Sequence, residues 1–152
     1  MNNALIERAG ALLSSARHAV ALTGAGISTP SGIPDFRSTA SGLWRQADPM
    51  VVASLAGFRR SPAAFYDWLR PLAGQVARAE PNPAHRALAA LERAGRLQAV
   101  ITQNIDGLQQ RAGSRRVLEL HGHLRTATCL QCRRQTATEG LLDAFLASGE
   151  VP

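Results

Sequence analysis

The sequence predicts an α/β protein with a mostly parallel sheet and helices on both faces. Short apolar runs at 18–22, 97–101 and 117–120 suit buried strands. Helical patterns separate these runs, and strands that alternate with helices favour parallel pairing. A segment after residue 122 that contains two cysteines interrupts the alternation, which predicts a small second module.

The first fifty residues predict a helix, a strand and a long loop. Apolar residues recur at helical spacing over 3–17, and the strand 18–22 follows. Residues 24–28, Gly-Ala-Gly-Ile-Ser, turn sharply out of that strand. Residues 29–49 are rich in Pro, Gly and Ser, and long loops inside compact domains are usually functional or disordered. We expect a functional loop because it holds Asp35, Phe36 and Arg37.

The remaining elements follow from periodicity and breakers. Helices are predicted over 50–57, 62–78, 84–94, 106–112 and 139–148. Pro81 and Pro83 break the chain before the third of these helices, and Gly95 ends it. Residues 123–137 are predicted to form a hairpin-like module around Cys129-Leu130-Gln131-Cys132.

Length and composition exclude several classes. The 152 residues suffice for one core with a small appendage, and no apolar run reaches a membrane span. The N-terminus lacks a basic region followed by an apolar one, so we expect a cytoplasmic protein. All 17 basic residues are Arg, and they are spread along the chain, which argues against direct nucleic-acid binding and for attraction of anionic ligands.

Reactive polar side chains follow two of the predicted strands. Gln103, Asn104 and Asp106 come after 97–101, and His121 comes after 117–120. Open α/β sheets hold their ligands at the carboxyl ends of strands, so these groups predict one active site. Two simpler interpretations remain: the first three cap the next helix, and His121 is a hydrogen-bonded histidine at a strand end.

The glycine turn after the first strand suits phosphate binding. Glycines let the backbone approach a pyrophosphate closely, and amide groups there are free to donate. The usual dinucleotide fingerprint is incomplete, because Thr29 stands at the third glycine position. The turn is weak evidence alone and becomes stronger with the following Gly32-Ile33-Pro34-Asp35-Phe36-Arg37.

Taken in order, four motifs resemble the successive signatures of the sirtuins, which are NAD-dependent protein-lysine deacylases. These motifs are residues 24–28, 32–37, 102–108 (Thr-Gln-Asn-Ile-Asp-Gly-Leu) and 120–122 (Leu-His-Gly). The resemblance runs from about residue 19 to the end. It implies an incomplete Rossmann-like sheet over 1–122, with a helical and cofactor-loop insertion at about 30–80. Residues 123–152 would be part of a small zinc-ribbon module.

The resemblance also implies roles for single residues. His121 would be the general base, since an imidazole titrates near neutral pH. The acyl group would pass to ADP-ribose, nicotinamide would leave, and NAD would be consumed. Contacts with NAD would come from Gly24, Ala25, Gly26, Thr29, Asp35, Phe36, Arg37, Gln103, Asn104, Ile105, Asp106 and His121. Proteins carrying acyl-lysine would be the substrates.

Cys129 and Cys132 admit three interpretations. Structural zinc usually takes two such cysteine pairs, and this sequence holds one. A redox pair would usually begin a helix in a thioredoxin-like setting. A site that recruits His121 or His123 would occupy the proposed base. The resemblance favours half of a structural Zn²⁺ site, with the second pair missing because the chain stops early. We therefore expect a C-terminally truncated and inactive fragment.

Two other functions use the same residues. One is an NAD-dependent protein ADP-ribosyltransferase, and the other is a non-catalytic module that binds NAD or ADP-ribose. Deacetylation is the activity that the resemblance favours, and the sequence predicts no oligomeric state.

Overall fold

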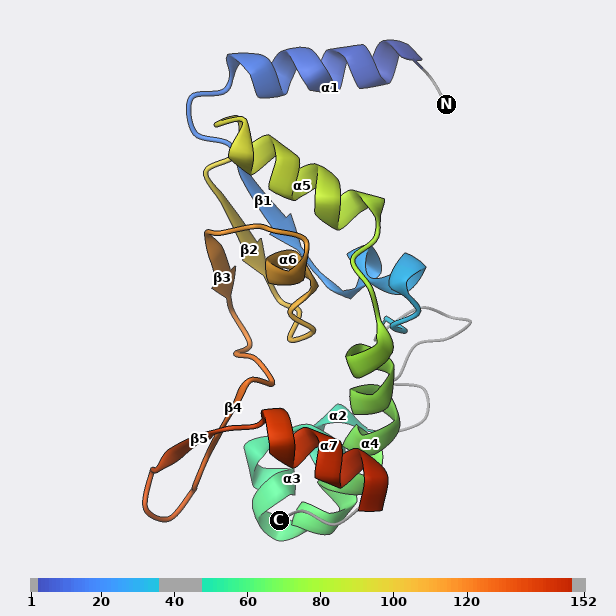
Figure 1. Cartoon of the computed structure of the whole chain (residues 1–152), viewed down its shortest axis with the longest axis vertical. Coiled ribbons are helices and arrows are strands. Elements are labelled where there is room, and N and C mark those ends of the chain that lie inside the picture. Colours follow the sequence, from blue (N-terminus) through green and yellow to red (C-terminus); the bar gives the residue numbers. More distant parts are fainter. Residues whose placement is uncertain (1–2, 36–47, 149–152) are drawn as a thin grey trace.

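The computed structural model describes residues 3–35 and 48–148, which form two lobes (Figure 1). The first lobe holds a parallel sheet, and the second gathers helices and a hairpin. Across both lobes, the described residues form the helices α1 (Asn3–Ser15), α2 (Pro49–Val52), α3 (Leu55–Arg60), α4 (Pro62–Arg78), α5 (Pro83–Arg93), α6 (Leu108–Arg111) and α7 (Glu139–Ser148). Two 3₁₀ turns, η1 (Ala25–Ile27) and η2 (Thr29–Ser31), follow the first strand.

The sheet has three parallel strands in the order β1-β2-β3. They are β1 (Val20–Thr23), β2 (Ala99–Thr102) and β3 (Val117–Glu119). In register, Thr23 lies beside Thr102, and Thr102 lies beside Glu119. All three strands therefore end at one edge, and the segments that follow them meet there. This arrangement confirms the predicted α/β class with a parallel sheet.

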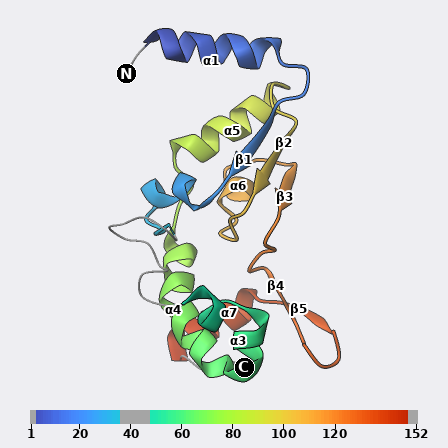
Figure 2. The same cartoon turned by 180° about the vertical axis from the view of Figure 1, so that it is seen from behind.

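Helices α5 and α6 lie on the same side of the sheet in both views (Figures 1 and 2). In the central strand, Val100 is fully buried. Across the sheet Leu22 and Leu118 share the opposite face and are 68% and 51% exposed. Among the described residues, helices therefore do not cover both faces of the sheet as expected. Helix α1 buries none of its side chains.

The second lobe joins segments that are far apart in the sequence. Strands β4 (Thr126–Thr128) and β5 (Gln135–Ala137) pair antiparallel, as the hairpin-like pattern predicts. Helix α7 packs on α4, where the rings of Tyr66 and Phe145 lie 5.7 Å apart and Arg70 stacks over Phe145. The predicted insertion and the hairpin segment therefore share one lobe in space. The predicted division at residue 122 stays a prediction.

The apolar core between the lobes is small. Ile33, Leu72, Ala79 and Leu108 form it, with Trp68 and Val76 packed against it. This core packs the loop after η2 against α4 and the start of α6. It therefore fixes the segments that surround the carboxyl ends of the strands. Among the described residues, no helix is both long enough and apolar enough to cross a bilayer.

Candidate active site

A cleft of about 690 Å³ opens where the three parallel strands end. Its lining combines the glycine turn with the polar residues that follow β2 and β3: Leu22, Thr23, Gly24, Ala25, Gly26, Ile27, Asp35, Gln103, Asn104 and His121. A second cavity of about 400 Å³ adjoins it. Ala25, Gln103, Asn104 and His121 line both, so the two cavities form one site.

The structure brings most of the predicted site residues together. Ile105 and Asp106 line the smaller cavity, and His121 is an exposed residue at the boundary of both. Thr29 lines neither cavity; its hydroxyl donates to the Gly26 carbonyl at 3.0 Å and holds the turn instead. Phe36 and Arg37 lie outside the described residues. The proposed roles of all these residues stay predictions.

The two glycines of the turn are not required by the fold. Gly24 has φ −139°, which any residue adopts, and Gly26 also lacks a positive φ. A Cβ on Gly26 would meet no atom within 4 Å, and one on Gly24 would meet only the Gln103 amide oxygen, at 3.9 Å. The missing side chains therefore leave open space in the cleft. This is what close approach of a ligand to the backbone requires.

Ser28 anchors a buried network beneath the cleft. Its hydroxyl donates to the Asp106 Oδ2 atom at 2.7 Å and accepts from the Asn104 amide nitrogen at 3.1 Å. The Asn104 amide nitrogen also lies 3.2 Å from Asp106 Oδ2. Ser28 is fully buried, and Asn104 is 8% exposed. The glycine turn is thereby fixed to the segment that follows β2.

His85 extends this network from the start of α5. The backbone N–H of Asn82 donates to His85 Nδ1 at 3.3 Å. The neutral ring therefore carries its proton on Nε2, which lies 3.5 Å from the Ser28 hydroxyl. Burial lowers the pKa of His85 below its usual 6.5, and the charge of Asp106 opposes that shift. The ring is therefore a neutral donor at neutral pH.

Asn82 ties the same helix to the glycine turn. Its side-chain nitrogen donates to the Ile27 carbonyl at 2.7 Å and to the Ser31 hydroxyl at 3.0 Å, while its oxygen caps α5 through the Ala84 amide. Sequence reasoning missed Ser28, Asn82 and His85 as site residues. The available signal was an asparagine before Pro83 followed by a histidine at the third helical position.

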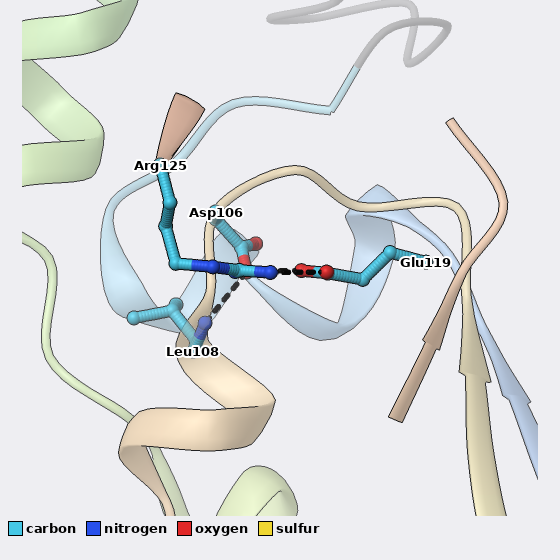
Figure 3. Close-up of polar contacts among 4 residues, drawn as sticks. All are labelled: Asp106, Leu108, Glu119 and Arg125. Carbon is cyan, nitrogen blue, oxygen red and sulfur yellow. Dashed lines mark hydrogen bonds and ion pairs between the residues drawn. The ribbon is translucent and has the colours of Figure 1, made fainter. Parts of the chain in front are cut away.

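Asp106 serves two structural roles at once. Its Oδ1 atom accepts from the Leu108 amide at 2.9 Å and caps the start of α6 (Figure 3), while Oδ2 takes the bonds from Ser28 and Asn104. The bond to the Leu108 amide agrees with the helix-capping alternative for Asp106, although Gly107 is the N-cap residue of α6. A carboxylate has about four acceptor positions, so one remains for a ligand.

Cys129 and Cys132 are exposed thiols at the tip of the hairpin. Backbone amides of Cys132 and Gln131 donate to the Cys129 sulfur and lower the pKa of its thiol. Such a knuckle is suited to metal binding, but the described residues contain no group of three or more potential metal ligands. The residues present thus fit two of the four positions of a structural zinc site, and no third ligand lies among the described side chains.

Comparisons with known proteins agree with this arrangement. The chain is 51% identical to NAD-dependent protein deacylase 2 of Archaeoglobus fulgidus over 147 residues, which are 97% of the chain and 57% of that protein. It is 45% identical to NAD-dependent protein deacetylase 2 of Caldanaerobacter subterraneus, covering 97% of the chain and 59% of that protein. The chain therefore spans a little over half the length of these relatives.

Solved structures give the same result. A Sir2 enzyme structure matches 97% of the chain with a TM-score of 0.87 and 51% identity, and the match covers 57% of that protein. A Sir2 variant solved with a deacetylated p53 peptide and 3′-O-acetyl ADP-ribose matches 94% of the chain, and 57% of its own, with a TM-score of 0.86 and 40% identity. The model of the Sir2 family matches residues 24–149. This chain belongs to the Sir2 family.

Proposed function

We propose that this chain carries the nicotinamide and ribose side of an NAD-dependent protein-lysine deacylase, with acetyl-lysine as the favoured substrate. The observation that carries the proposal is the open glycine turn facing Gln103, Asn104 and His121 in one cleft. Relatives named as deacylases and deacetylases support the same chemistry.

Each wall of the site suits one part of NAD. The amides beside Gly24 and Gly26 approach the phosphates, because no side chain intervenes. Gln103 and Asn104 face the space for the nicotinamide ribose. The smaller cavity takes the nicotinamide ring, where the remaining acceptor position of Asp106 receives the carboxamide N–H.

His121 is placed to move a proton. It follows β3 and lines both cavities, so its imidazole reaches the space assigned to the ribose hydroxyls. When bound, NAD supplies an activated ribose carbon that accepts the acyl oxygen as nicotinamide leaves. The imidazole then removes a proton from a ribose hydroxyl, whose oxygen attacks the former acyl carbon. One water is added, the bond from that carbon to the lysine nitrogen breaks, free lysine leaves, and the acyl group stays on ADP-ribose.

The direct test measures nicotinamide release from NAD by the full-length protein that contains this chain, with and without an acetyl-lysine peptide. Peptide-dependent release that is lost in His121→Ala supports the proposal. The products separate the alternatives: loss of acetyl from the peptide indicates a deacylase, while addition of ADP-ribose to a protein indicates an ADP-ribosyltransferase. Binding of ADP-ribose without any release favours a non-catalytic module and contradicts the proposal.

Zinc enters as a separate proposal. We propose that Cys129 and Cys132 supply half of a structural zinc site whose other two ligands come from outside the described residues. Support comes from the amide bonds to the Cys129 sulfur, which favour its thiolate form. In the full-length protein, zinc titration with a colorimetric competitor should show loss of binding in Cys129→Ser, and unchanged affinity in that variant would contradict this.

A further inference from the structure

Arg125 connects the hairpin lobe to the end of the sheet. It directly precedes β4, and its Nη1 atom donates to the Glu119 Oε1 atom at 2.9 Å, while Nη2 donates to the other carboxylate oxygen (Figure 3). The Glu119 side chain is 11% exposed and that of Arg125 is 52% exposed. The hydrogen bonds from Arg125 lower the pKa of Glu119, so the pair is charged at neutral pH.

The ion pair encloses the segment that carries His121. Glu119 and Arg125 are six residues apart, and His121 lies between them. On the sheet side, the Leu120 amide donates to the Thr102 carbonyl at 2.9 Å, and Gly122, with φ 79°, closes a turn onto the Glu119 carbonyl. After this turn the chain is hydrogen-bonded to the hairpin lobe, where the backbone N–H of Thr138 donates to the Arg125 carbonyl at 3.0 Å.

The same guanidinium also lies close to the start of α6. A Cβ added to Gly107 would lie 4.0 Å from Arg125 Nη1, so the side chain packs over the residue that follows Asp106. Arg125 therefore contacts both segments that bring polar groups to the cleft, the one with Asp106 and the one with His121. The other ion pair that the described residues form, Arg111 with Glu80, joins the end of α6 to the chain after α4 and does not involve the His121 segment.

We propose that Arg125 and Glu119 are positioning residues, which fix the His121 segment relative to Asp106 by joining the hairpin lobe to the end of β3. The proposal rests on the proposed function, because it assigns the pair to the proton transfer at His121. Breaking the pair leaves the glycine turn intact but lets His121 move away from the ribose. The loss should thus appear in kcat, while the affinity for ADP-ribose is retained.

The first experiment measures order by amide hydrogen exchange in NMR. In Arg125→Gln we expect exchange at Leu120 and Gly122 to accelerate about tenfold, the effect of losing one charged hydrogen-bonded pair, with no change at Val100. Arg125→Lys should restore part of the protection because it keeps the charge without the bidentate geometry. Glu80→Gln is the matched control, since it removes a carboxylate from the other ion pair. Unchanged exchange in Arg125→Gln, or equal acceleration in the control, overturns the proposal.

The second experiment separates positioning from general stability. In the full-length protein, with NAD and an acetyl-lysine peptide, Arg125→Gln should lower kcat by about 10- to 100-fold, with partial rescue in Arg125→Lys, while calorimetry gives an unchanged Kd for ADP-ribose. Retained kcat in Arg125→Gln overturns the positioning role and leaves the proposed function standing. Absence of nicotinamide release in the unmodified protein overturns the proposed function, and the exchange experiment then decides whether the pair orders the segment.

Discussion

The hydroxyl of Ser28 donates to the carboxylate of Asp106 at 2.7 Å across 78 residues of sequence. This bond joins the turn after β1 to the loop after β2, so the two halves of the candidate NAD site are fixed to each other. Asn104 and His85 bond to the same hydroxyl, so the buried Ser28 hydroxyl has a partner for its donor and for both acceptor positions. The site is thus organised in the chain before any ligand binds.

Ser28→Ala should destabilise the protein by about 1–3 kcal/mol, because it leaves the His85 ring N–H and one N–H of the Asn104 side chain without an acceptor. Urea unfolding measures the change. Ser15→Ala is the control, since its exposed hydroxyl bonds only the Leu12 carbonyl within α1. Equal stability of the two variants would contradict the buried network.

Acid should destabilise the fold through His85. The pKa of His85 is lowered in the folded state, so between that value and 6.5 the unfolded chain binds more protons. Above about pH 6.5 His85 does not lower the free energy of unfolding. As pH falls from 6.5 toward the lowered pKa, the free energy of unfolding decreases by at most about 1.4 kcal/mol per pH unit.

Urea midpoints of His85→Gln at pH 7.5 and 5.5 check this assignment. The variant should show a smaller fall over that range than the unmodified chain, while His18→Gln, which alters an exposed histidine, should behave like the unmodified chain. An identical acid slope in His85→Gln would exclude this histidine as the cause.

Gly26→Ala should leave stability nearly unchanged and weaken ADP-ribose binding. The added Cβ meets no protein atom within 4 Å, yet it occupies the space left open in the cleft. Thermal unfolding and calorimetry measure the two effects separately. A variant that binds as tightly as the unmodified chain would show that the turn does not approach the ligand.

Gly57→Ala should have the opposite pattern. Its Cβ would lie 1.9 Å from the Val51 carbonyl oxygen, so the contact between α2 and α3 must shift. Overpacking of this kind costs about 1–3 kcal/mol, or roughly 3–10 °C in Tm for a chain of this size. Gly10→Ala, where nothing lies within 4 Å, should not lower Tm. A Tm for Gly57→Ala within error of the Gly10 control would contradict the packing described.

Local patterns in the sequence predicted much of this fold. An apolar run followed by polar residues placed Gln103, Asn104 and His121 at strand ends, and periodicity predicted the helix 139–148 that the structure has as α7. These features depend on neighbours in the chain, so a single sequence carries them. The predicted helix over 106–112 was too long, because Gly107 delays the start of α6 to Leu108.

Long-range relations could not be read in the same way. His85 bonds to Ser28 across 57 residues, and the local capping pattern with Asn82 does not reveal that distant partner. The exposed face of the sheet was also missed, because Leu22 and Leu118 belong to apolar runs that look equally buried on both sides. Which face is covered depends on packing between elements and not on composition.

The most direct test of the account is an NMR footprint of ADP-ribose on the chain. Amide shifts should cluster at Gly24, Ala25, Gly26, Gln103 and Asn104, which line the cleft, and should be small at Cys129 and Cys132 in the hairpin. The same titration on Gly26→Ala should require a higher ligand concentration. Shifts confined to the hairpin, or none at saturating ligand, would contradict the assignment of this cleft as the NAD site.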